Sequence, residues 1–421
     1  MLISADQALQ IVIDNVTTLG IERVSIREAL GRVLAQEIRS ARDIPGFDNS
    51  AMDGYALRAS DIAGASEQRP AKLAVVETIA AGSMPHSEVT AGRAMRIMTG
   101  APLPPGADAV VPVEQTREHD GVVEILVSAP TGFSIRRRGE DLRRDESVMS
   151  AGKRLGPSDI GLLASLNRAI VEVYRRPRVA ILAGGDEIVD IDQVPSGAQV
   201  VDSNGYALAA AVIEAGAEPT MLKVARDRLE NVRERVTEAV TFDAVLSTGG
   251  VSVGQFDLVE KVFEELGMRR LFHGIAQKPG RPMMFGLIGR RPIFALPGNP
   301  VSTVVCFYLY VRPALLRMGA RRDLGLPRLT ARCAVDIKTA ANFTEFVRVK
   351  LERRDGELYA APTGAQGSGI LSSLSRADAL LIGPAKETVL KAATQATVLL
   401  LAGAELDSEI GFEERLRLQE Y

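Results

Sequence analysis

The sequence contains few of the residues that form disulfides and transition-metal centres. Among its 421 residues are two cysteines, Cys306 and Cys333, three histidines and no tryptophan. The cysteines do not form a paired ligand motif, so the composition argues against a Cys/His zinc site and against a disulfide framework. We therefore expect a protein of a reducing compartment, and we expect it in the cytoplasm.

The sequence also lacks a long hydrophobic run and a secretory leader. Its most apolar stretch, residues 304–311, is far shorter than the roughly 20 residues that cross a bilayer. The N-terminus has no basic region followed by an apolar segment. We therefore expect no membrane contact.

Neither sign of charge is in excess. The chain has 50 basic and 53 acidic residues and a net charge of −3. This balance argues against a general nucleic-acid binder, although local basic clusters can still bind small anions. The length predicts two to four domains. We expect a small charged molecule as the ligand and no nucleic acid.

A glycine-rich stretch at residues 242–257 is the first candidate site for such a ligand. A buried strand leads into a turn with two adjacent glycines, and a helix-patterned segment follows Asp257. Bare backbone N–H groups and hydroxyls can bind phosphate there, and the carboxylate can hold a bridging cation. The alternative is a tight strand-to-helix connection that needs glycine only for its backbone angles. The candidate binding residues are Ser247, Thr248, Gly249, Gly250 and Ser252.

Strand and helix patterns alternate from Arg178 onward and predict a doubly wound α/β domain at residues 176–326. In such sheets ligands bind beyond the carboxyl ends of the strands, and Asp186, Glu187 and Asp227 also fall there. A second turn precedes a helix whose first amides and Ser302 offer another anion site. The residues of this second turn are Pro297, Gly298, Asn299 and Pro300.

The rest of the chain predicts three further parts of an α/β multidomain protein. Capping boxes at Ser4 and Ser25 predict two opening helices that reach about Ile38. Short β-branched segments predict a β-rich inserted domain at residues 43–133. Residues 1–42 and 134–175 would then form one discontinuous, helical N-terminal domain. Residues 327–421 have the pattern of a C-terminal β-barrel or sandwich.

Polar stretches in the N-terminal half allow two interpretations. Asp53 lies in the segment DNSAMDGYA, which is either a site loop or an Asn/Asp turn that bonds its own backbone. Thr99 precedes a proline-rich loop of a kind that is usually structural. Asp141 belongs to the run SIRRRGEDLRRDE, whose composition fits a solvated face.

Together these motifs resemble one family. The segments DNSAMDGYA, TGAPLPPGADAVVPVE, RRRGED, GGDE, STGGVSVGQFD, KPGRP and LPGNPVS, in this order, resemble the molybdopterin molybdenumtransferases, which include MoeA and the gephyrin E domain. The resemblance implies an enzyme that takes adenylylated molybdopterin and molybdate, inserts molybdenum at the dithiolene and releases AMP with Mg²⁺. It also implies four domains, a homodimer with the site between chains, and a molybdopterin adenylyltransferase as a further candidate partner.

The resemblance assigns roles to individual residues. The catalytic positions it implies are Asp53, Thr99, Asp141, Glu187, Asp227 and Asp257. The molybdate positions it implies are Lys278, Arg281, Ser302, Arg348 and Ser368. Carboxylates suit Mg²⁺, and the implied metal ligands are Asp186, Glu187, Asp227 and Asp257. One departure is visible: Ala183, Gly184 and Gly185 stand where the family usually has hydroxyl residues before its glycine, so this loop lacks a donor.

Two alternative functions and one alternative substrate stay open at this point. A molybdopterin adenylyltransferase shares the α/β domain and its STGG loop, but the first 175 residues and the C-terminal β segments argue against it. A non-enzymatic scaffold like gephyrin is the second alternative, and the chain has no fused adenylyltransferase domain or long linker to support it. The sequence does not distinguish molybdate from tungstate.

Overall fold

The computed structural model describes residues 2–249 and 258–401, and the chain divides into two compact units. Unit 1 comprises Met1–Val24, Ala29–Val33 and Glu172–Tyr421, and unit 2 comprises Ser25–Glu28 and Leu34–Val171. The four-domain boundaries expected from the sequence are finer than this division and stay a prediction.

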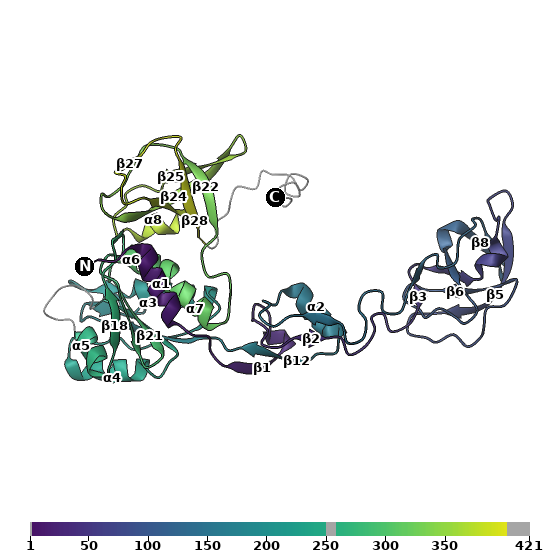
Figure 1. Cartoon of the computed structure of the whole chain (residues 1–421), viewed down its shortest axis with the longest axis horizontal. Coiled ribbons are helices and arrows are strands. Elements are labelled where there is room, and N and C mark those ends of the chain that lie inside the picture. Colours follow the sequence, from purple (N-terminus) through teal and green to yellow (C-terminus); the bar gives the residue numbers. More distant parts are fainter. Residues whose placement is uncertain (1, 250–257, 402–421) are drawn as a thin grey trace. The chain divides into compact units, whose positions relative to one another are not determined.

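A six-stranded sheet forms the centre of the α/β domain in unit 1 (Figure 1). Its strand order is β16 (Glu218–Met221), β13 (Arg178–Ala183), β17 (Ala244–Thr248), β21 (Arg291–Leu296), β20 (Met284–Ile288) and β18 (Arg269–His273). The first four strands are parallel, and β20 is antiparallel to both of its neighbours. The carboxyl ends of β13, β17 and β21 therefore share one edge of the sheet.

Helices cover both faces of this sheet, which confirms the doubly wound fold. One layer contains α1 (Ala5–Asn15), α3 (Ser203–Glu214), α6 (Pro300–Cys306), the π-helical segment η4 (Phe307–Val311) and α7 (Arg312–Met318). The other layer contains α4 (Leu229–Ala239) and α5 (Leu258–Glu265). Successive strand residues point to opposite faces, so Val179 and Ile181 join the first core while Ala180 and Leu182 join the second.

The N-terminal segment was predicted only in part. The capping box is confirmed, because Ser4 Oγ accepts from the Gln7 amide at 3.1 Å and Gln7 Oε1 accepts from the Ser4 amide at 3.0 Å. Buried residues of α1 pack into the first α/β core, so this helix lies in unit 1. The second expected helix is wrong: η1 (Ile26–Glu28) is one 3-10 turn, and the chain then enters a left-handed conformation at Gly31, φ +75°.

Unit 2 contains the expected β-rich insertion. Its six-stranded sheet has the order β7 (Ala109–Pro112), β4 (Gly54–Leu57), β6 (Arg93–Ile97), β5 (Ala71–Ile79), β9 (Val122–Ile125) and β8 (Thr116–His119). Short 3-10 turns η2 (Ala59–Ile62) and η3 (Val113–Gln115) connect its strands. Outside the sheet lie α2 (Pro157–Ser165) and the strand pairs β2 (Ile38–Arg39) with β11 (Ser147–Met149) and β3 (Asn49–Ser50) with β10 (Ile135–Arg136).

The C-terminal part of unit 1 is a closed β-barrel, as the sequence predicted. Strands β24 (Thr344–Arg354), β25 (Glu357–Pro362), β22 (Arg328–Cys333), β28 (Gln395–Leu400) and β26 (Ala379–Gly383) pair in this order, and β26 pairs back with β24. A short pair, β23 (Ile337–Lys338) with β27 (Val389–Leu390), and the helix α8 (Leu371–Ser375) complete it. The α/β domain contributes β19 (Gln277–Lys278), which pairs in parallel with the start of β24.

Within residues 2–249 and 258–401, one helical stretch is long and apolar enough to cross a membrane. It is Pro300–Met318, and 78% of its most apolar window is buried inside the structure. Most of its buried hydrophobic residues belong to the first α/β core and, at Val301, Val304 and Val305, to a neighbouring hydrophobic cluster, so its hydrophobic character is that of a core helix.

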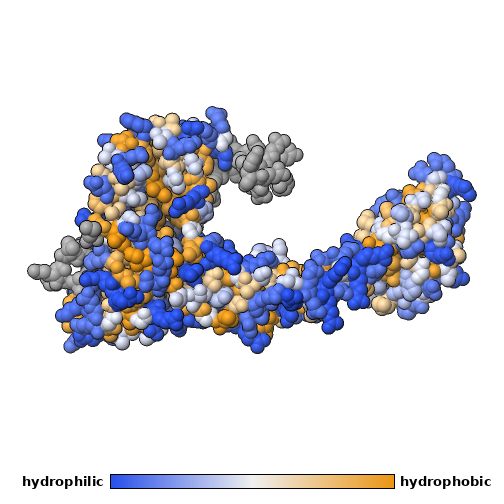
Figure 2. Space-filling view, in the orientation of Figure 1, coloured by the Kyte–Doolittle hydropathy of each residue, from blue (hydrophilic) through white to orange (hydrophobic). Residues whose placement is uncertain are grey.

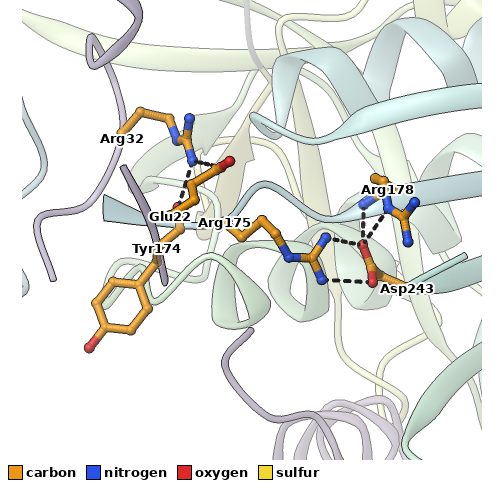
Figure 3. A network of polar contacts seen from close by, with 6 residues as sticks. All are labelled: Glu22, Arg32, Tyr174, Arg175, Arg178 and Asp243. Carbon is orange, nitrogen blue, oxygen red and sulfur yellow. Dashed lines mark hydrogen bonds and ion pairs between the residues drawn. The ribbon is translucent and has the colours of Figure 1, made fainter. Parts of the chain in front are cut away.

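A polar network within unit 1 surrounds the end of strand β12 (Ile170–Tyr174), which pairs with β1 (Ile21–Ser25) (Figure 3). Arg175 binds Asp243 through two bonds of 2.9 Å, and the Arg178 amide donates to the same carboxylate at 2.9 Å. Arg32 bonds Glu22 and the Tyr174 carbonyl. Burial raises the pKa of Asp243, but the bonds from Arg175 and Arg178 outweigh it, and its pKa lies below the usual 3.8.

Replacing Asp243 by Ala should lower the free energy of unfolding by about 2–3 kcal/mol, because the loss leaves Arg175 partly buried without its partner. The folded-state pKa is depressed, so the stabilisation is present above pH 3.8 and is lost as the pH falls through the folded value. Urea denaturation followed by circular dichroism measures the change. The control Asp336→Ala removes an exposed pair with Lys391 and should cost less than about 1 kcal/mol. Equal costs would contradict the role given to Asp243.

Candidate functional site

Three loops meet at the carboxyl edge of the α/β sheet. The Gly184 amide, just after β13, donates to the Thr248 carbonyl at 3.2 Å. A Cβ on Gly249, just after β17, would lie 3.0 Å from the Gly184 carbonyl oxygen. A Cβ on Gly298, just after β21, would lie 3.7 Å from the Gly249 Cα. The three loops thus lie in close backbone contact, which is tightest at Gly249.

Gly249 itself is needed for structural reasons. Its φ is +81°, a conformation that favours glycine, and the approach of Gly184 leaves little space for a side chain. The interpretation as a tight connection therefore accounts for this residue without a ligand. Gly250, Ser252 and Asp257 lie outside the described residues.

Two buried polar atoms near this edge have no hydrogen-bond partner within the described part of the chain. They are Ser247 Oγ and Asn204 Oδ1, and Ser247 is only 1% exposed. The Asn204 side chain, in the first turn of α3, donates to the Gly298 carbonyl at 2.8 Å. An unpaired buried acceptor is costly, so these atoms are candidates to bind a ligand. Asn204 is not among the residues predicted from the sequence, although the helix start Asp202–Ser203–Asn204 was a signal.

The start of α3 holds a buried carboxyl group. The Asp202 side chain caps the helix by accepting from the Gly205 amide at 2.8 Å. Burial raises the pKa of Asp202, and the bond from Gly205 only partly opposes this effect. Asp202 therefore fixes the turn that presents Asn204 to the Gly298 loop.

The predicted metal carboxylates come from neighbouring loops. Asp186 and Asp227 are joined reciprocally: the Asp227 amide donates to Asp186 Oδ1 at 3.2 Å, and the Asp186 amide donates to Asp227 Oδ2 at 3.4 Å. The Glu187 carboxylate lies against Gly185, where a Cβ would be 2.3 Å from Glu187 Oε2. Among residues 2–249 and 258–401, no three His, Cys, Asp or Glu side chains are gathered as a metal cluster. The carboxylate oxygens suit Mg²⁺ chemically, with other ligands from phosphate or water.

A pocket of about 600 Å³ adjoins Asp186. Its lining combines two arginines with acidic and amide side chains: Asp186, Arg226, Arg228, Glu230, Asn231 and Glu234. Arg226 also donates to the carbonyls of Asp186 and Ile188, each at 3.1 Å. The pocket therefore offers both cationic and polar groups beside the Asp186–Asp227 pair.

We call the carboxyl edge of the sheet, with Gly184, Gly249 and the Asp186–Asp227 pair, the first seat. The second seat lies where the α/β domain meets the barrel. The Lys278 ammonium is 3.0 Å from Glu345, a buried carboxylate, while the Lys278 side chain itself stays 54% exposed. Arg281 lies over the Phe343 ring at 5.7 Å. Gly280 approaches Ser302, because a Cβ there would be 3.7 Å from the Ser302 carbonyl oxygen.

Arg348 and Ser368 reach the same region from the barrel. The Ser368 carbonyl accepts from the Val301 amide at 3.0 Å, which places it at the start of α6. Arg348 is 1% exposed, and its guanidinium donates to Ser373 Oγ at 3.1 Å and to the Gly367 carbonyl at 3.0 Å. Burial lowers the pKa of Arg348, and Glu345 opposes the shift. Within unit 1 the structure thus brings the five predicted molybdate residues to one neighbourhood.

The start of α6 joins the two seats. Pro300 occupies its first turn after Asn299, as predicted, and Thr303 Oγ1 donates to the carbonyls of Pro297 and Asn299. Gly298 contacts the first seat, whereas Val301 and Ser302 contact the second. One turn of polypeptide thus borders both.

The remaining predicted residues lie in unit 2. The Thr99 amide and hydroxyl both donate to Asp53 Oδ1 at 2.6 Å, and these bonds lower the pKa of Asp53. Asp141 is exposed, and its amide donates to the Ile44 carbonyl at 3.1 Å.

The arginine run around Asp141 forms ion pairs within unit 2. Arg137 bonds Asp48 at 2.7 Å, and Arg138 bonds Asp43 at 2.5 Å. Figure 2 shows a hydrophilic surface along the part of unit 2 between α2 and β3. The run is therefore a solvated, internally paired surface, as its composition indicated.

Comparison with known proteins agrees with this organisation. Residues 3–167 match the MoeA N-terminal region (domain I and II), residues 180–317 a probable molybdopterin binding domain, and residues 330–401 the MoeA C-terminal region (domain IV). A molybdopterin molybdenumtransferase of Nostoc sp. is 35% identical over 90% of this chain and 88% of its own length. One of Bacillus subtilis is 34% identical over 86% of each chain.

Solved structures show the same relationship. A crystal structure of the molybdopterin biosynthesis MoeA protein from Pyrococcus horikoshii OT3 is 31% identical, with a TM-score of 0.79 over 95% of this chain and all of its own. Another MoeA structure from the same genus is 34% identical, with a TM-score of 0.80 over 96% of this chain. The three matched regions and these relatives together show that the chain belongs to the molybdopterin molybdenumtransferase family of molybdenum cofactor biosynthesis enzymes.

Proposed function

We propose that the chain inserts molybdate into adenylylated molybdopterin, with cleavage of the phosphoanhydride and release of AMP. The observation that carries the proposal is the pair of seats joined by the start of α6. The first seat offers the carboxylates of Asp186 and Asp227 and the Ser247 hydroxyl, which has no partner among the described residues; these groups suit a phosphorylated ligand and its metal ion. The second offers the exposed cations Lys278 and Arg281, as an oxyanion requires, and the buried Arg348 is the third proposed cation.

The proposed role of each seat follows from the chemistry of its residues. A tetrahedral dianion loses its hydration shell on binding, and ammonium, guanidinium and hydroxyl donors replace it. Residues of the first seat hold the phosphoanhydride and orient it for cleavage. A magnesium ion, when bound by carboxylates such as Asp186 and Asp227, neutralises charge that develops on the leaving phosphate. Glu187 and Asp257 are the further proposed metal ligands.

We also propose that the enzyme is a cytoplasmic homodimer. Its substrate requires an adenylyl-transfer reaction to supply it, so a molybdopterin adenylyltransferase is the proposed partner. Light scattering on the purified chain should give twice the mass of one chain, and a monomer with full activity would contradict this proposal.

The experiment that tests the function starts from adenylylated molybdopterin. With molybdate and Mg²⁺ present, the purified chain should release AMP and yield molybdenum-containing molybdopterin in equal amounts. A molybdopterin adenylyltransferase would instead consume ATP and release pyrophosphate, and a scaffold would do neither. Replacing molybdate by tungstate in the same assay measures the preference between the two oxyanions.

Replacing Arg281 by Ala should weaken molybdate binding about tenfold to a hundredfold, because a charge-assisted hydrogen bond contributes roughly 1.5–3 kcal/mol. AMP affinity should stay unchanged. Arg281 is exposed, so the fold should tolerate its loss. The control Arg290→Ala removes another exposed arginine, in the turn between β20 and β21, and should change neither affinity. Calorimetric titration measures both ligands, and an equal loss for AMP and molybdate would contradict two separate seats.

A further inference from the structure

A buried polar network lies directly beneath the loop that carries Lys278 and Arg281. Its members are Gln277 in β19, Cys306 at the end of α6 and Tyr310 in η4. Gln277 and Tyr310 are 1% exposed, and Cys306 is fully buried. Tyr310 and Cys306 belong to the apolar core of the first helical layer, where a polar group is costly unless it is hydrogen-bonded.

The network bonds the loop backbone at two consecutive carbonyls. Gln277 Nε2 donates to the Pro279 carbonyl at 2.9 Å, and the Cys306 thiol donates weakly to the Gly280 carbonyl at 3.7 Å. Gln277 Nε2 is also 3.7 Å from Cys306 Sγ. Tyr310 donates its hydroxyl to Gln277 Oε1. The amide of Gln277 is therefore held from both ends and cannot rotate without breaking a bond.

The packing around Gly280 is equally close. A Cβ on Gly280 would lie 2.4 Å from Cys306 Sγ and 2.7 Å from Gln277 Nε2. Both side chains thus fill the space that a larger residue would occupy. The contacts with Gln277 and Cys306 consequently fix the Pro279–Gly280 turn, and Lys278 and Arg281 stand at its two ends.

We propose that Gln277 and Tyr310 are positioning residues for the second seat, which is the proposed oxyanion seat. They touch no ligand, but they hold the turn that aims Lys278 and Arg281, so that the two cations need little rearrangement when an oxyanion binds. A turn released from this network would sample other arrangements, and binding would have to restrict it again. This inference rests on the proposed function, because it concerns the affinity for the oxyanion substrate.

The test is Tyr310→Phe, which removes one hydroxyl and leaves the ring in place. Gln277 Oε1 then loses its partner, and the Gln277 side chain is free to rotate away from Pro279. Molybdate affinity should fall about threefold to tenfold, the range expected from one lost hydrogen bond. AMP affinity should not change. In the turnover assay the KM for molybdate should rise by the same factor, with wild-type kcat at saturating molybdate.

The chain offers a matched control two residues away. Tyr308 lies in the same π-helical segment and donates its hydroxyl to Glu214 at 3.1 Å, away from the loop. Tyr308→Phe should cost similar stability and leave molybdate affinity at the wild-type value. A second variant, Cys306→Ala, removes the thiol donor to Gly280 without altering Tyr310, and it should weaken molybdate in the same direction by a smaller factor.

Calorimetry with molybdate alone and with AMP alone separates the outcomes. Weakened molybdate binding in Tyr310→Phe but not in Tyr308→Phe supports the proposal. Wild-type affinity in Tyr310→Phe, or an equal loss in both tyrosine variants or for both ligands, overturns it. If the wild-type chain itself does not bind molybdate, both the assignment of the oxyanion seat and the proposed function are wrong. The other outcomes test only the positioning role of Gln277 and Tyr310.

Discussion

Replacing Gly280 by Ala should abolish measurable molybdate binding and lower the free energy of unfolding by about 2–4 kcal/mol. Two costs combine at this position. Gly280 has φ +98°, which L-residues rarely adopt, and its Cβ would overlap Cys306 Sγ and Gln277 Nε2. Both neighbours are buried, so neither can move aside without displacing core residues. The turn itself must shift, and Lys278 and Arg281 shift with it.

A second glycine separates the two costs. Gly289, in the turn between β20 and β21, has φ +59° but no heavy atom within 4 Å of an added Cβ. Gly289→Ala should therefore lose only about 1 kcal/mol through backbone strain, with unchanged molybdate affinity. Urea denaturation followed by circular dichroism gives the stabilities, and calorimetry gives the affinities. If the two alanine variants behaved alike, the close packing beneath Gly280 would not matter for the seat.

Replacing Asp227 by Asn should reduce the rate of AMP release about a hundredfold to a thousandfold, because a lost metal-binding carboxylate removes several kcal/mol of charge stabilisation. Asp227 is exposed, and its backbone bond to Asp186 does not depend on its side-chain charge. The fold should therefore be retained. The measurement is turnover against Mg²⁺ concentration, and the variant should need more Mg²⁺ for half-maximal rate.

The control for Asp227 is Asp355→Asn in the barrel. Asp355 occupies the turn between β24 and β25 at φ +50°, a conformation that asparagine tolerates. The Asp355→Asn variant makes the same change in charge at a distant site of the same unit, and its turnover should stay at the wild-type level. Wild-type turnover of Asp227→Asn at limiting Mg²⁺ would show that Asp227 does not hold the metal.

The elements of the α/β domain could be predicted because their signals are local. Residues 178–183 form a strand whose alternate side chains enter two different cores, and continuous burial on both faces is what an apolar run indicates. The capping box at Ser4 and the first-turn proline at Pro300 are likewise short-range signals that the structure confirms. The same rule failed at Ser25, where a left-handed Gly31 follows the first turn.

The family motifs selected the candidate residues, which stay predictions, but not the residues that support them. Asn204 was missed because its contact, the Gly298 carbonyl, is 94 positions away in the chain. Tyr310 and Cys306 were indistinguishable from core residues, since they stand in an apolar run. Only the packed structure shows that their polar atoms face one turn.

The sequence by itself determined the fold class, the strands and helices of the α/β domain and the motifs that identify the family. These follow from periodicity, caps and turns, which depend on backbone geometry over a few residues. The tertiary structure alone decided which loops touch, that α1 packs into the α/β core and that Gln277 bonds a tyrosine 33 positions later. Such contacts depend on how whole elements pack, because burial and hydrogen bonding are satisfied jointly by distant segments.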